Sequence, residues 1–151
     1  MTTVFLSGSR QLNRLNDIIK NRINNMTEKG FLILVGDANG ADKAMQKHLT
    51  DTHYSNVVIF CAGENCRNNI GNWNVTQVSV DPKLKGRDFY TAKDIEMALK
   101  ADYGFVLWDG KSSGAINNVF ELLKHNKQVV VYFSPEKKFH TISNLKDAKV
   151  L

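Results

Sequence analysis

The sequence lacks several features that would place it in a specialised class of protein. No apolar run approaches the ~18 residues needed to span a membrane, and the N-terminus has neither the basic start nor the long apolar core of a signal peptide. The only two cysteines, Cys61 and Cys66, are spaced too widely for a C-x-x-C zinc or redox pair. We therefore expect a cytoplasmic protein with reduced thiols, no membrane segment, no metal and no cofactor.

Signatures of common enzyme classes are also missing. The four histidines form no H-E-x-x-H pattern, and there is no G-x-S-x-G turn for a nucleophilic serine. The chain contains neither a G-x-G-x-x-G dinucleotide fingerprint nor a Walker A sequence. These absences disfavour metal-dependent catalysis, NAD-dependent redox chemistry and ATP hydrolysis.

Composition predicts one ordinary domain. The chain has 151 residues, of which 42% are hydrophobic and 23% charged. Its net charge of +5 permits an anionic partner, but the basic residues are scattered and form no run of like charge. A small phosphorylated ligand is therefore favoured over a nucleic acid.

The order of the predicted elements defines the fold class. Buried strands are expected at 3–7, 31–35, 57–61, 103–108 and 129–133, and helices at 12–26, 41–49, 90–100 and 115–125. Strands that alternate with helices form a parallel sheet with right-handed crossovers. We predict an α/β fold: a single Rossmann-like domain with a parallel sheet of about five strands and helices on both faces.

Two regions do not follow this alternation. Residues 62–87 are rich in glycine and asparagine, apart from a short strand pattern at 75–80, and could form a lid over a ligand. Trp73, within this segment, either stacks on a ligand or plugs the edge of the sheet. Residues 134–151 form a C-terminal extension with a weak helix near 142–149.

Three of the strand-to-helix loops contain small and polar residues that suit an anion. Loops that follow parallel strands meet at one edge of the sheet, where ligands bind in open α/β folds. The start of the helix after 103–108 favours a phosphate, although Ser112 could simply cap that helix. The candidate ligand residues in these loops are Gly8, Ser9, Arg10, Gly36, Asp37, Gly40, Asp42, Gly110, Ser112, Ser113 and Gly114.

Four segments in order resemble the SLOG superfamily. They read S-G-S-R at 7–10, V-G-D-A-N-G-A-D at 35–42, K-D-I-E-M at 93–97 and W-D-G-K-S-S-G-A at 108–115. Members of its small bacterial and phage branch typically read G-S-R, G-D-A-x-G-x-D, R-N-x-x-M and W-D-G-x-S-x-G-T. The superfamily is Rossmann-like, includes the Lonely Guy phosphoribohydrolases and the DNA-processing protein DprA, and is similar to the nucleoside deoxyribosyltransferases.

The resemblance implies a nucleotide site. The turn at 8–10 and the helix start at 112–114 would hold a phosphate or ribose, and Arg10 would supply a charge-assisted contact. Arg87, just before the helix expected at 90–100, is a further candidate ligand residue. Asp37 and Asp42 could bond sugar hydroxyls. Two alternatives remain open: Arg10 could pair with Asp37 or Asp42, and Asp42 could cap its own helix.

The sequence departs from the family at the catalytic positions. Asn118 stands where the phosphoribohydrolases have glutamate, Lys93 replaces an arginine, and Ala115 replaces a threonine. An amide keeps the shape of a carboxylate but removes its charge. Glu121, one turn further on, and Asp109 are the nearby acids, although Glu121 is more simply a solvated or salt-bridged helix residue.

These departures favour binding over turnover. We expect a nucleoside phosphate or ADP-ribose type of ligand, bound by a sensor or accessory module that forms a homo-oligomer. The alternative is an N-glycosidase of phosphoribohydrolase or deoxyribosyltransferase type, which would use Glu121, Asp109, Asn118 and Lys93. DNA binding, as in DprA, is a further alternative.

Overall fold

Seven strands form one sheet in the computed structural model, which describes residues 1–151. They are β1 (Thr3–Gly8), β2 (Leu32–Gly36), β3 (Val57–Ala62), β4 (Asn74–Val78), β5 (Tyr103–Trp108), β6 (Gln128–Phe133) and β7 (Lys138–Ile142). The spatial order is β4-β3-β2-β1-β5-β6-β7, and only β7 runs antiparallel to its neighbour. The predicted α/β Rossmann-like fold is confirmed.

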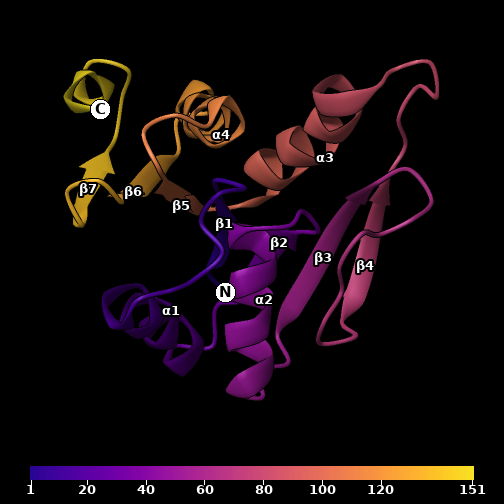
Figure 1. Ribbon diagram of the computed structural model, residues 1–151, viewed down its shortest axis with the longest axis horizontal. Helices are drawn as coiled ribbons and strands as arrows, with labels where there is room; N and C mark the ends of the chain where they lie inside the picture. The colour runs from indigo at the N-terminus through magenta and orange to yellow at the C-terminus, as the bar shows by residue number, and fades with distance from the viewer.

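Two layers of helices cover the sheet (Figure 1). Helices α1 (Asp17–Glu28) and α2 (Ala41–Asp51) lie on one face, and α3 (Gly86–Lys100) and α4 (Ser113–Lys124) lie on the other. Alternate residues of β1 serve the two cores: Val4 and Leu6 pack under α1 and α2, while Phe5 packs under α3 and α4. Burial on both faces explains why the central strands read as continuous apolar runs.

The sheet has two strands beyond the five that the sequence predicts most clearly. β4 occupies most of the alternating pattern expected at 75–80. β7 was missed, since residues 134–151 were expected to form a C-terminal extension with no strand, and the helix expected near 142–149 is only a 3-10 turn at Asp147–Val150. Ser134 and Lys137 close the tight turn between β6 and β7, where the amide of Lys137 donates to the carbonyl of Ser134 at 3.2 Å. This turn folds β7 back onto β6 as an edge strand.

Local capping sets where the helices begin. The side chain of Asn16 accepts from the amide of Ile19 at 2.9 Å, so α1 begins at Asp17 rather than near 12. At the other face, α3 begins at Gly86, four residues before the predicted start at Tyr90. None of the helices is long and apolar enough to cross a membrane.

No helix connects β3 to β4. The segment 63–73 makes this crossover instead, and Gln46 of α2, which is fully buried, holds it in place. The side-chain amide of Gln46 donates to the carbonyls of Gly36 (2.9 Å) and Asn68 (3.1 Å), and its oxygen accepts from the amide of Ile70 (2.9 Å). Trp73 donates to the carbonyl of Tyr54 at 2.9 Å and packs against the α1–α2 core. Trp73 therefore plugs the sheet edge, which was one of its two predicted roles.

We predict that Gln46→Leu destabilises the protein by about 2 to 3 kcal/mol, because it leaves buried backbone groups of the crossover without partners. Lys43, an exposed residue of the same helix that makes no side-chain hydrogen bond or ion pair, is the matched control, and Lys43→Leu is expected to change stability by less than about 0.5 kcal/mol. Urea unfolding of the two variants measures both effects. Equal free energies of unfolding for the two variants would show that the crossover does not depend on Gln46.

Candidate functional site

A pocket lies at the carboxyl ends of β1 and β5, where the helices that follow these two strands turn to opposite faces of the sheet. The chain leaves β1 for α1 on one face and leaves the adjacent β5 for α4 on the other, so the carboxyl ends of these strands border a crevice. The pocket there has a volume of about 910 Å³. Its lining includes residues of the β1 and β5 loops, the start of α2, and the facing sides of α3 and α4.

Ser9 joins the loops behind this pocket. It is fully buried; its amide donates to the carbonyl of Leu107 at 2.8 Å, and its hydroxyl accepts from the amide of Asp109 at 3.1 Å. Its carbonyl accepts from the amides of Leu12 (3.1 Å) and Ala41 (3.2 Å). One small residue thus holds the end of β5 and the start of α2 against the end of β1.

Gly8 allows that close approach. A β-carbon at this position would lie 2.5 Å from the β-carbon of Ala41 and 2.9 Å from the carbonyl oxygen of Leu107. Because both neighbours belong to packed elements, no larger residue fits.

Asp109 organises the loop between β5 and α4. Its Oδ1 accepts from the amides of Lys111 (2.9 Å) and Ser112 (2.8 Å). Burial acts to raise the pKa of Asp109, but the hydrogen bonds from Ser112 and Lys111 outweigh it and hold the pKa below its usual value. Asp109 is therefore an ionised anchor of the loop, and its proton is not readily available for acid catalysis.

The loop presents the start of α4 to the pocket. Ser112 is the N-cap, and its hydroxyl accepts from the amide of Ala115 at 3.4 Å, which confirms the capping alternative. The amides of Ser113 and Gly114 have no acceptor within the protein, and both residues line the pocket. The cap leaves these first-turn donors free, so capping and anion binding are compatible.

A cluster of buried charges lies beside the end of β2. Lys93 of α3 is 4% exposed, and its Nζ lies 2.7 Å from Oδ1 of Asp94. Gly36 provides the space for it, since a β-carbon there would lie 2.6 Å from Oδ2 of Asp42 and 2.8 Å from Nζ of Lys93. Burial would lower the pKa of Lys93, but Asp94 and Asp42 raise it above its usual value, so the amine stays charged.

Asp42 is the acid most strongly perturbed by this environment. Burial raises its pKa to about 6, against a smaller lowering effect of Lys93. Its Oδ2 accepts from the amide of Ala38 at 3.2 Å, before the helix begins. Gly40 is the N-cap of α2, with φ of 81°, so the alternative in which Asp42 caps this helix is wrong.

Arg67 takes the partner that was considered for Arg10. Asp37 is fully buried and accepts from the amide of Arg67 (2.8 Å) and from its Nη2 (2.7 Å). Burial would raise the pKa of Asp37, but these hydrogen bonds hold it below its usual value. The guanidinium of Arg67 also lies 3.7 Å from the ring centre of Tyr90 on α3. Arg10 is exposed and makes no ion pair with Asp37 or Asp42, so that alternative is wrong.

Asn118 and Glu121 face the pocket from α4. Asn118 is buried, and its amide donates to the hydroxyl of Ser7 at 2.6 Å. Glu121 lies 3.0 Å from Nε2 of His125, one turn further along the helix. Both side chains therefore have partners within the protein, and Glu121 is bridged as the simpler interpretation of the sequence expects.

The structure brings most of the predicted site residues to one pocket. Those that line it are Gly8, Arg10, Asp42, Arg87, Lys93, Asp109, Ser112, Ser113, Gly114, Asn118 and Glu121. Four others are buried behind its walls, and Gly110 is exposed in the loop after β5 outside the lining; the four are Ser9, Gly36, Asp37 and Gly40. Sequence reasoning missed the lining residues Ser7, Gln11, Arg67, Tyr90, Asp94 and Lys124. Helical spacing from Lys93 could have found Tyr90, but no signal marks Arg67.

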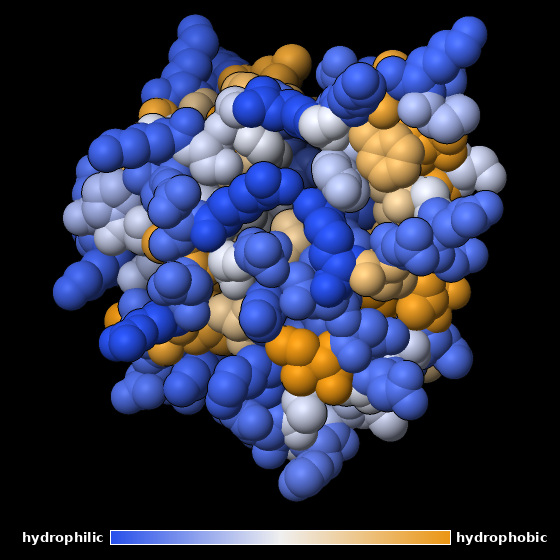
Figure 2. Space-filling model, turned by 45° about the vertical axis from the view of Figure 1, so that its right-hand side comes forward, coloured by the Kyte–Doolittle hydropathy of each residue, from blue (hydrophilic) through white to orange (hydrophobic).

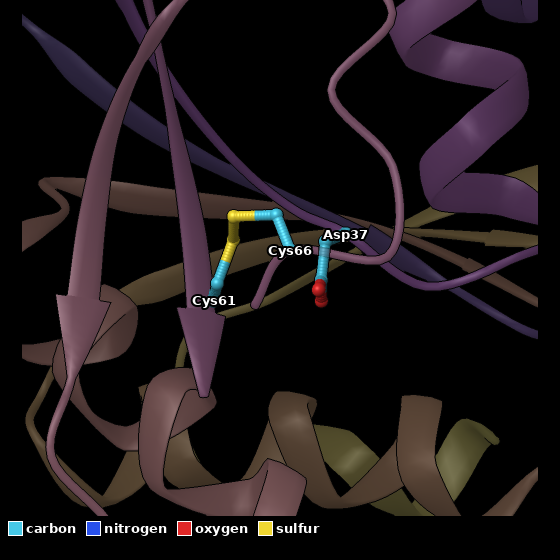
Figure 3. Close-up of side chains that lie close together, drawn as sticks. All are labelled: Asp37, Cys61 and Cys66. Atoms are coloured by element: carbon cyan, nitrogen blue, oxygen red, sulfur yellow. A yellow bond between two sulfur atoms is a disulfide. The ribbon is translucent and has the colours of Figure 1, made fainter. Parts of the chain in front are cut away.

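The expectation of two reduced thiols is wrong for this structure. Cys61 is the penultimate residue of β3 and lies next to the loop that carries Cys66; their Cα atoms are 5.2 Å apart and their sulfur atoms are bonded (Figure 3). A carboxylate oxygen of Asp37 and the two sulfurs lie within 4.8 Å of one another. In the disulfide form all three groups have partners within the protein: the two sulfurs are bonded to each other, and Asp37 accepts a hydrogen bond from Arg67.

Comparison with known proteins supports the fold. No protein-family model and no curated protein matches the sequence. A structure of DNA processing protein A from Helicobacter pylori, described for its binding of single-stranded DNA, superposes with a TM-score of 0.65 at 16% identity. The match covers 86% of this chain and 64% of that one, so this chain spans less than two thirds of its neighbour. A likeness at this identity concerns the fold, and it is consistent with the SLOG resemblance.

The raised pKa of Asp42 gives a stability prediction. A folded pKa of about 6 against a usual value of 3.8 means that stability is fully present below pH ~4 and is lost as pH rises through about 6. Asparagine resembles the neutral acid, so Asp42→Asn is expected to stabilise the protein at pH 8 by about 2 kcal/mol and to have little effect near pH 4. Urea unfolding at both pH values measures this difference. Destabilisation at pH 8 would mean that Lys93 requires the charge of Asp42.

Proposed function

We propose that the protein binds a nucleotide or nucleotide-derived ligand, of nucleoside phosphate or ADP-ribose type, at the carboxyl edge of the sheet. The observation that carries the proposal is the free start of α4, where the amides of Ser113 and Gly114 line the pocket without acceptors. Helix starts of this kind bind phosphate through their N–H groups and the positive end of the helix dipole.

Charge and size support the same ligand. Arg10 and Arg87 line the pocket and make no ion pair within the protein, so both guanidinium groups are available to a phosphate. A volume of about 910 Å³ lies within the range of small-molecule sites, roughly 300 to 1,000 Å³. Tyr90, with Arg67 against its ring, offers a flat wall for a base.

The state of the acids favours a sensor or accessory role over turnover. Asp109 is held by its own loop, Glu121 is bridged to His125, and the family's glutamate position holds Asn118, which is bonded to Ser7. None of these groups is a free carboxylate facing the ligand, as attack at C1′ of a nucleotide would require.

One observation favours the alternative, an N-glycosidase of phosphoribohydrolase or deoxyribosyltransferase type. Asp42 lines the pocket and has its pKa raised to about 6, and a carboxyl with such a pKa retains a protonated fraction near neutral pH that can act as a general acid. Such an enzyme would release free base with a rate that falls above pH 6, and Asp42→Asn would abolish the release. Base release that persists in that variant would remove Asp42 from the mechanism.

DNA is the less favoured partner, suggested by the described activity of the structural neighbour. The face shown in Figure 2 is largely hydrophilic, with hydrophobic residues in separate patches. Binding to DNA would weaken steeply with salt, because basic side chains would displace counterions from the phosphates. Salt-independent or absent binding of DNA would rule out this alternative.

A homo-oligomer remains a prediction from the family resemblance.

The test is a thermal shift against nucleoside mono-, di- and triphosphates, NAD and ADP-ribose, followed by chromatography of each mixture. We expect stabilisation by an intact ligand. Arg10→Gln should weaken binding about tenfold, because it removes a charge-assisted hydrogen bond to phosphate.

Arg14→Gln is the matched control, since Arg14 is exposed and lies outside the pocket. Equal affinity of the two variants, or the absence of any stabilising nucleotide, would contradict the proposal. Release of free base would favour the enzyme instead.

A further inference from the structure

The disulfide lies directly beside a wall of the pocket. Cys66 precedes Arg67 in the chain, and Figure 3 shows the bonded sulfurs next to Asp37, the residue that holds Arg67. Cys61 is fixed at the end of β3 and fully buried, whereas Cys66 is partly exposed on the crossover segment. Loops are in general more mobile than strands. The bond therefore ties the crossover loop to the sheet at the point where the loop reaches the pocket.

Arg67 is placed by its own contacts with Asp37 and Tyr90, and Gln46 holds the segment that follows it. Its amide and Nη2 both donate to Asp37, at 2.8 and 2.7 Å, and its guanidinium lies over Tyr90. Its Nε is buried and has no hydrogen-bond partner. The guanidinium thus depends on the backbone at Cys66 and Arg67 remaining beside Asp37.

The following residue shares this dependence. Asn68 donates to the carbonyl of Asp37 at 2.8 Å and to the side chain of Asn39 at 3.0 Å. Both contacts reach the loop after β2, which also contributes Ala38 to the pocket. A shift of the backbone at Cys66 would therefore disturb two successive contacts and a second wall of the site.

We propose that the Cys61–Cys66 pair is a redox switch that controls the position of Arg67 and, through it, the affinity of the pocket for its ligand. The second half of this inference rests on the proposed nucleotide-binding function. The disulfide form holds Arg67 and Tyr90 in place before the ligand arrives, which lowers the entropic cost of binding. Gly63 and Glu64 stay hydrogen-bonded to β4 in either form, so the dithiol form frees residues 65–66 and weakens the hold on Arg67.

The switching reaction needs an external dithiol. Its thiolate attacks Sγ of Cys66, the more accessible sulfur; the S–S bond breaks, and Cys61 leaves as a thiolate that takes up a proton. The second thiol of the reductant then displaces Cys66, which also becomes a thiol, and the reductant departs as a cyclic disulfide. Two electrons and two protons pass to the protein.

The first test needs no ligand. Amide hydrogen exchange is measured for the whole chain in the oxidised form and in the form reduced by dithiothreitol, with a chelator present so that no metal ion bridges the thiols and Asp37. We expect faster exchange at Arg67 and neighbouring residues on reduction, with the strands β1 and β5 unchanged. The Cys61→Ser/Cys66→Ser variant should exchange its amides as fast as the reduced form does, and adding the reductant should not change its exchange. Identical exchange in both forms would overturn the proposal.

The second test measures affinity for the stabilising nucleotide from the thermal-shift panel. Reduction should weaken binding about fivefold or more in the natural sequence, a typical size for coupling between sites. In Arg67→Gln the affinity should depend on the reductant less than in the natural sequence, because only the contacts of Asn68 would still respond. Equal affinities of the oxidised and reduced natural protein would overturn the proposal that the disulfide controls ligand affinity.

The two proposals fail in different ways. Changed exchange at Arg67 in a protein that binds no nucleotide in either form would sink the proposed function and leave the link between the disulfide and Arg67 standing. Unchanged exchange in a protein that binds nucleotide would sink the switch alone.

Discussion

The hydrogen bonds of Ser9 are the constraint on which the site depends. Three of its groups, the amide, the hydroxyl and the carbonyl, hold the ends of β1 and β5 and the start of α2 together. The neighbouring position, Gly8, has no room for a side chain, so the two strand ends and the start of α2 are packed closely together. With the strand ends fixed, the loop after β5 can direct the start of α4 into the crevice.

Charges are distributed unequally around that crevice. The side next to β2 carries three carboxylates, Asp37, Asp42 and Asp94, against the two cations Lys93 and Arg67. At the start of α4, by contrast, two amides have no acceptor within the protein. An anionic group would therefore settle at the start of α4, while the side next to β2 shapes the remainder of the pocket.

The sequence predicted the parts of the molecule whose signals are local. Buried strands such as 103–108 and the polar loops after them follow from apolar runs that stop at glycine and aspartate, and their convergence follows from the geometry of parallel sheets. The Ser112 cap was also readable, because it depends on residues three apart.

The missed features depend on contacts between distant residues. Arg67 reaches the pocket only because Gln46 pins its segment and Asp37 accepts its guanidinium, and neither contact leaves a pattern near Arg67 in the sequence. The pairing of Cys61 with Cys66 likewise requires the loop to turn back beside β3. β7 was missed because an edge strand buries little, which leaves only a weak alternation.

The free amides at the start of α4 are expected to bind the anionic group of the ligand. The most direct measurement is a titration of the isotopically labelled protein with ADP-ribose and nucleoside monophosphates, followed by amide NMR. We expect the largest shifts to fall on Ser113, Gly114 and the turn at Gly8 to Arg10, and to saturate. Saturable shifts confined to another surface, such as the opposite edge around Phe31 and Tyr103, would contradict it.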